Sequence, residues 1–282
     1  MRTALRTHWP EYLMEAAGLF LFMISACAFG TLLGHPGSPV VQAVPDALVR
    51  RVLMGLAMGL TAVGLICSPW GQRSGAHFNP ATTLTFWRLG KVAPADAGFY
   101  MLAQVLGGLA GVAIAATALG ALVAHPSVQY VATVPGSGGD AAAFVAEVII
   151  TFILISMVLR VSNTADLARF TPLVVGALVA TYIILEAPIS GMSMNPARSL
   201  ASAWPAQAWE PLWIYFLAPP LGMVLAAEVY VRRRGLAAVL CAKLHHDNTQ
   251  GCIFHCRFAE LAVTQPDTAT PMSSRAAVRP RA

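Results

Sequence analysis

The chain has 282 residues, of which 57% are hydrophobic and only 11% are charged. This composition excludes a soluble domain, whose surface needs more polar residues, and predicts an integral multi-pass membrane protein. The net charge of +5 matters through the position of the basic residues relative to the membrane, and we expect no nucleic-acid partner.

Six apolar runs are long enough to cross a bilayer, whose hydrocarbon core of ~30 Å needs ~20 helical residues. They cover roughly residues 11–33, 48–67, 96–123, 141–160, 170–188 and 210–231. Two further segments, 74–91 and 189–204, are neither clearly spanning nor clearly loops, and each contains Asn-Pro-Ala. The spans contain no nucleophile paired with a base and no metal constellation, so we expect neither an enzyme nor a cofactor.

The basic residues predict the orientation, because short cytoplasmic loops of membrane proteins accumulate Lys and Arg. We therefore expect both termini to be cytoplasmic. In that orientation most of the basic residues near span ends lie inside the cell, namely Arg2, Arg6, Arg73, Arg88, Lys91, Arg160, Arg169 and the cluster 232–234. Only Arg50, Arg51 and Arg198 then lie outside. The connection 125–140 has no Lys or Arg, as expected of an external loop.

The two halves of the chain resemble each other. Glu15 begins EAAGLFLF in the first span and Glu147 begins EVIITFIL in the fourth, so each carboxylate is followed five residues later by Phe. This pattern indicates a duplicated unit, with repeat one over about 11–123 and repeat two over about 141–231. Three spans per unit force the second copy to run inverted in the membrane.

Each Asn-Pro-Ala segment predicts a loop, a cap and then a short helix. Proline is favoured in the first helical turn and Asn is a strong N-cap, so helices are expected from Pro80 towards Arg88 and from Pro196 towards Trp204. About ten residues span ~15 Å, half of the hydrocarbon core. Two such re-entrant half-helices would meet at the midplane, where their N-termini repel cations. There the amides of Asn79 and Asn195 would bind a neutral solute.

These features resemble the aquaporin, or major intrinsic protein, family. The resemblance covers about residues 11–232 and rests on SGAHFNPA (74–81), SGMSMNPARS (190–199), the paired glutamates and the plan of six spans with two half-helices. It implies an all-α channel domain over 1–232, homotetrameric in the lipid bilayer of the plasma (cell inner) membrane. Every subunit would hold its own pore for water or small uncharged solutes. The motif residues carried over are Asn79, Pro80, Ala81, Asn195, Pro196 and Ala197.

The resemblance also implies a selectivity filter near the external mouth, with Arg198 donating hydrogen bonds to the solute. Counting back from Asn195 without gaps adds Ile183 and Met192. Matching LAMGL (56–60) adds Met58, although a one-residue insertion between this stretch and Asn79 leaves Gly59 as the alternative. The apolar lining departs from strict water channels, whereas Ser199, Ala203, Tyr215 and Phe216 look like the water-channel subgroup. Water and glycerol-like solutes therefore both remain open.

The intramembrane carboxylates allow two interpretations. Glu15 and Glu147 would either accept hydrogen bonds from the non-helical loops, as in the family, or carry protons in a proton-coupled secondary transporter of a small solute. Their symmetric placement favours the supporting role and a passive channel. His77 is expected to be a neutral, hydrogen-bonding residue of the pore wall.

The tail, residues 233–282, contains three Cys and three His between Cys241 and Cys256. A metal site is one interpretation, but Cys-x3-Cys with scattered His is not a regular zinc spacing, so we expect reduced cysteines without a metal in a cytoplasmic tail. Beyond Thr264 the composition predicts disorder.

Overall fold

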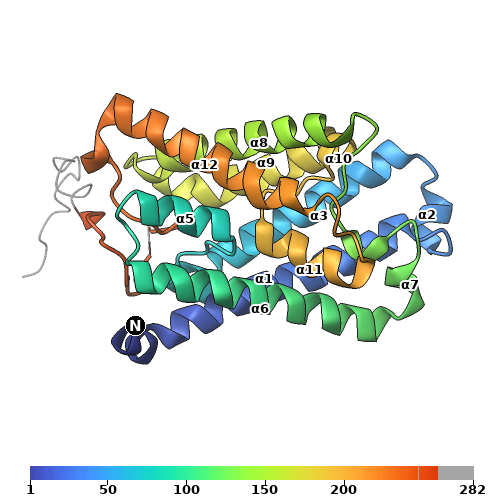
Figure 1. The fold of residues 1–282 in the computed structure, drawn as a ribbon, viewed down its shortest axis with the longest axis horizontal. Helices are drawn as coiled ribbons and strands as arrows, with labels where there is room; N and C mark the ends of the chain where they lie inside the picture. The colour runs from blue at the N-terminus through green and yellow to red at the C-terminus, as the bar shows by residue number, and fades with distance from the viewer. Residues whose placement is uncertain (247, 260–282) are drawn as a thin grey trace, which may run out of the picture.

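The computed structural model describes residues 1–246 and 248–259, and this part of the chain is helical without strands (Figure 1). Six of the described helices are long and apolar enough to cross a membrane. They are α1 (Arg2–Gly34), α3 (Ala47–Cys67), α6 (Pro94–Leu119), α8 (Gly139–Ser162), α9 (Thr171–Leu185) and α12 (Leu212–Arg234). The fifth span is the continuous run Ala168–Leu185, in which a 3-10 turn precedes α9. The predicted all-α membrane fold is therefore confirmed.

Short helices connect or accompany these spans. The α-helical ones are α2 (Pro39–Ala43), α4 (Pro69–Ser74), α5 (Pro80–Arg88), α7 (Ala121–Ala124), α10 (Ala187–Ser190) and α11 (Pro196–Ala206). Single 3-10 turns form η1 (Gln129–Val131), η2 (Ala168–Phe170) and η3 (Leu236–Ala238).

The helices α5 and α11 are the two half-helices. They have nine and eleven residues, which at 1.5 Å per residue cover about half of a bilayer core. Figure 1 shows them between the long helices, reaching from opposite ends of the bundle towards its middle. Each begins with Pro directly after an Asn cap, as the sequence predicts.

The long helices pair in the same way in both halves. In the first half α1 packs along α6, in the second α8 packs along α12, and α3 packs on α9 between the halves. The last contact is close because Gly59 and Gly176 face each other. A Cβ on Gly59 would lie 2.6 Å from the Gly176 oxygen, so small residues are needed at this crossing.

Two span boundaries differ from the sequence prediction by more than three residues. The first helix starts at Arg2 rather than near residue 11, since its polar first turns are tied to α6: His8 Nδ1 and the Tyr12 hydroxyl lie 2.9 and 2.5 Å from Asp96 Oδ1. The third span ends at Leu119 rather than 123, because Gly120 has φ 55° and breaks the helix. Apolarity marks where a helix meets lipid, not where it begins.

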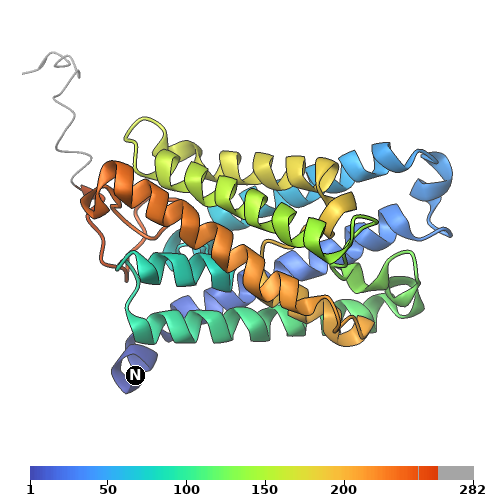
Figure 2. The ribbon, with the colours of Figure 1, turned by 45° about the horizontal axis from the view of Figure 1, so that its top comes forward.

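The chain after α12 returns across the end of the bundle at which the N-terminus lies (Figure 2). Leu240 N donates to Asn163 Oδ1 at 2.7 Å, and His255 N donates to the Lys91 carbonyl at 3.0 Å. The described tail residues are thus packed against the bundle. The disorder expected beyond Thr264 lies outside the described residues.

Candidate functional site: a central pore

Glu15 of α1 holds the loop before the first half-helix. Its carboxylate accepts hydrogen bonds from the backbone amides of His77 and Phe78, at 3.1 and 2.6 Å. It also accepts from the Ser74 hydroxyl and the Gln104 amide, both at 2.7 Å. The side chain is fully buried, and its acceptor sites are used to satisfy a non-helical backbone.

Glu147 of α8 holds the second loop in the same way. It accepts from Ser193 N at 2.6 Å, Met194 N at 2.8 Å and the Ser190 hydroxyl at 2.8 Å. The Tyr215 hydroxyl donates to the Ser190 carbonyl, as Tyr100 does to that of Ser74. The two loops are equivalent in their contacts as well as in their sequence.

Both loops have strained backbones that these contacts stabilise. Ala76 and Phe78 have φ of 56° and 46° in the first loop, and Met192 and Met194 have 53° and 55° in the second. Left-handed residues other than glycine cost roughly 1–2 kcal/mol each. The carboxylates therefore stabilise a loop conformation that is otherwise unfavourable.

The two Asn caps link the loops to each other. Asn79 Oδ1 accepts from Ala81 N at 2.9 Å, and Asn195 Oδ1 accepts from Ala197 N at 3.1 Å. The Nδ2 groups cross over: Asn79 donates to the Met194 carbonyl at 2.7 Å, and Asn195 to the Phe78 carbonyl at 2.8 Å. Each amide uses one N–H in this crossing and keeps a second.

A cavity of about 300 Å³ passes both Asn residues. Its lining includes all four predicted filter residues, Met58, Ile183, Met192 and Arg198. Gly59, the alternative to Met58, instead packs on α9. The sequence did not single out Phe22 and Val131, which also line the cavity. No motif marks them, because Phe22 is one of many apolar residues in its span and Val131 lies in a left-handed turn.

Arg198 is half-buried in the cavity wall. Its Nη1 atom is buried and has no hydrogen-bond partner among the described residues. A buried guanidinium donor without a protein partner costs free energy unless a solute or water accepts from it. Arg198 also interacts electrostatically with Glu147, which lies behind the loop.

His77 lines the cavity and is hydrogen-bonded at both ring nitrogens. Its Nδ1 lies 3.0 Å from Thr83 Oγ1, and its Nε2 lies 2.8 Å from the Ala242 carbonyl. Since a carbonyl only accepts, Nε2 carries a proton, and Nδ1 can accept from the threonine hydroxyl. The Ala242 contact comes from the tail, where Leu244 also lines the cavity. Nothing in the sequence indicates that the tail enters this space.

Comparisons with known proteins agree with this geometry. The sequence profile named Major intrinsic protein matches residues 3–230. Aquaporin NIP1-2 of Arabidopsis thaliana is 32% identical over 224 residues, covering 78% of this chain and 72% of the relative. The glycerol uptake facilitator protein-like 6 of Lactiplantibacillus plantarum is 34% identical over 77% of this chain and 94% of its own length. The crystal structure of the aquaglyceroporin from Plasmodium falciparum has a similar fold, with a TM-score of 0.63, 22% identity and coverage of 79% and 96%.

Proposed function

Because the chain belongs to the major intrinsic protein family, we propose that it is a passive channel for water and small uncharged solutes that excludes protons and ions. The observation that carries this proposal is the pair of Asn-capped helix N-termini at one cavity. Each terminus bears roughly half a positive elementary charge. Cations, including hydrated protons, are repelled there, while a neutral solute accepts from the free N–H of each Asn amide.

The four filter residues determine which solutes pass. Arg198 supplies the donor, and its unpartnered Nη1 atom supports this role. Met58, Ile183 and Met192 supply apolar, adaptable walls. Such a filter favours solutes with one polar face over strict selection of water, as expected for a chain whose relatives include both an aquaporin and a glycerol uptake facilitator.

The glutamates support a passive mechanism over proton coupling. A proton carrier must release and rebind its proton in each transport cycle, which exchanges its hydrogen-bond partners. Glu15 accepts four hydrogen bonds and Glu147 three, two of them in each case from backbone amides. If either carboxylate were protonated, its O–H would face a backbone N–H of the loop. Two donors cannot form a hydrogen bond, so a contact that holds the strained loop would be lost.

The proposed setting is a homotetramer in the plasma (cell inner) membrane with both termini cytoplasmic. The basic residues of the sequence support this orientation, and the N-terminus and the described tail lie at the same end of the bundle. The channel domain would comprise residues 1–232 and the tail 233–282. Each subunit would keep a separate pore, since the described cavity lies inside one chain.

Stopped-flow measurement of proteoliposome volume tests this function. The panel comprises water, glycerol, urea, ammonia and hydrogen peroxide, each with and without an imposed proton gradient. We expect flux that is linear in the solute gradient and independent of the proton gradient. Flux that requires the proton gradient, or saturates at low solute, would establish a transporter instead.

A further inference from the structure

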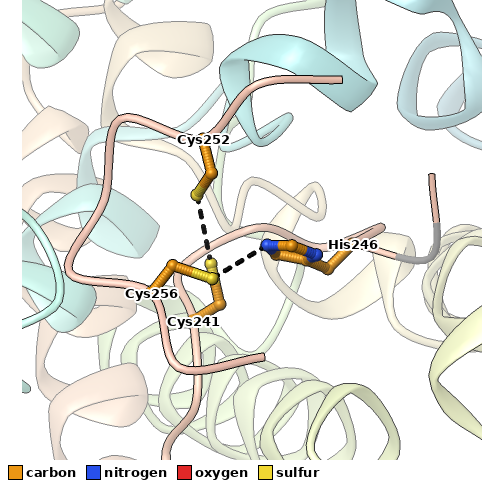
Figure 3. Close-up of side chains that lie close together, drawn as sticks. All are labelled: Cys241, His246, Cys252 and Cys256. Atoms are coloured by element: carbon orange, nitrogen blue, oxygen red, sulfur yellow. Dashed lines mark hydrogen bonds between the residues drawn. The ribbon is translucent and has the colours of Figure 1, made fainter. Parts of the chain in front are cut away.

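Four potential metal ligands meet in the tail at the end of the bundle that carries the N-terminus. This tail cluster consists of Cys241, His246, Cys252 and Cys256 (Figure 3). One ligand atom from each residue lies within 4.8 Å of all the others. Cys241 Sγ is 3.5 Å from Cys252 Sγ, and Cys256 Sγ is 2.9 Å from His246 Nε2.

We propose that the tail cluster binds one Zn²⁺ ion, and that the loaded site holds the tail in the mouth of the pore. Three thiolates and one imidazole are a usual donor set of structural zinc sites. Ligands at ~2.0–2.3 Å from a tetrahedral ion lie roughly 3.3–3.8 Å apart, so small side-chain adjustments complete the geometry. Soft sulfur donors exclude Mg²⁺ and Ca²⁺.

The charges around the tail cluster suit a metal. Metals bind cysteine in its thiolate form. Three thiolates and a neutral imidazole around Zn²⁺ carry one net negative charge. Lys243 is buried and interacts electrostatically with these thiols, so its ammonium group balances that charge.

Lys243 also fixes the backbone beside one ligand. Its Nζ donates to the Gln250 and Gly251 carbonyls, at 3.0 and 2.6 Å, directly before Cys252. Such outer contacts orient metal ligands. The described residues within 239–257 form no helix or strand, so this segment lacks the regular hydrogen bonds that usually stabilise a packed chain. A metal supplies the missing constraint, as it does in other small folds.

The residues between the ligands are those that enter the pore mouth. Ala242 O accepts from His77 Nε2, and Leu244 N donates to the Gly75 carbonyl at 3.0 Å. Leu244 lines the cavity. Phe254, between Cys252 and Cys256, stacks on the His77 ring with centroids 5.4 Å apart. The tail thereby occupies hydrogen-bonding groups and space that a permeating solute would use.

The closing role rests on the proposed channel function, whereas zinc binding does not. Zinc loading would keep Leu244 and Phe254 seated and the mouth closed, and removal of zinc would release them. A disulfide between Cys241 and Cys252 is the competing use of the cluster. It would leave Cys256 and His246 without a role.

Zinc content is the first test. The full-length protein, purified with reductant and loaded with Zn²⁺, is analysed for metal per chain, and Co²⁺ substitution reports tetrahedral thiolate ligation by absorbance. We expect one zinc per chain in the wild type and in Cys67→Ser, a control cysteine outside the cluster. Cys241→Ser and Cys252→Ser should lose the zinc and the Co²⁺ band. Equal zinc in all variants, no zinc in any, or a Cys241–Cys252 disulfide in the protein isolated without reductant would overturn the site.

Flux is the second test. We expect chelation of zinc to raise the solute permeability of wild-type proteoliposomes several-fold. Proteoliposomes with Cys252→Ser should already have the high permeability, and chelation should not change it. Phe254→Ala, which keeps all four ligands, should bind zinc and still show the high solute permeability. Zinc-independent flux in a zinc-binding protein would refute the closing role alone. Absence of flux in every variant, with zinc still bound by the wild type, would refute the channel and leave the metal site standing.

Discussion

Replacing Glu147 tests how the pore loops are held. The substitution Glu147→Ala removes the acceptor for two buried backbone amides, Ser193 N and Met194 N. A buried donor left unpaired costs about 1–3 kcal/mol, so the free energy of unfolding should fall by about 2–6 kcal/mol. Glu147→Gln keeps one acceptor oxygen but turns an NH₂ group towards one of the amides, which predicts a loss of about 1–3 kcal/mol.

The assay is denaturant unfolding of the purified protein in detergent, followed by tryptophan fluorescence. The expected order of stability is wild type, then Gln, then Ala, and solute flux of the Gln variant should fall only as far as folded protein is lost. Stability equal to the wild type in both variants would refute the supporting role. A Gln variant that is fully stable but has no flux would instead favour proton transfer through Glu147.

Three further substitutions address the filter and the helix crossing. Met192→Ala should raise water permeability at equal protein density, because a flexible side chain leaves the cavity wall; an unchanged stopped-flow rate would mean that the methionine does not narrow the pore. Arg198→Ala should weaken exclusion of cations and larger solutes in the liposome panel, and unaltered exclusion would remove Arg198 from the filter. Gly176→Val should reduce the yield of folded protein on size-exclusion chromatography, since its Cβ position lies 2.7 Å from the Gly59 oxygen, whereas Gly64→Ala, with open space at its Cβ position, is the matched control.

The half-helices were predictable because their signals are local. Asn followed by Pro specifies a cap and a first turn whatever surrounds it, and the repeated glutamate reveals the duplication within the sequence itself. The carboxylate contacts then follow from a general need, since buried irregular backbone requires acceptors. These signals predict the two half-helices and the support of the loops before them.

The remaining features depend on contacts between distant segments. Sequence counting left Met58 and Gly59 as alternatives because a one-residue shift is invisible without the partner helix. In the structure Gly59 packs on Gly176 and Met58 lines the cavity, which favours Met58. The Cys and His residues of the tail stand out in the sequence, but a metal site was not expected there because their spacing is irregular. Only a fold that returns the tail to the bundle brings Cys241 near Cys256.

The crossed amide contacts have a consequence for biosynthesis. Asn79 emerges from the ribosome long before Met194, whose carbonyl accepts a hydrogen bond from its Nδ2 group. The Phe78 carbonyl likewise gains its donor, Asn195 Nδ2, only when the second half has been synthesised. The first repeat therefore inserts with an incomplete centre that the second repeat must finish. A chain interrupted between the halves would insert its helices but lack the crossed amide contacts, and co-expression of the two pieces should restore them.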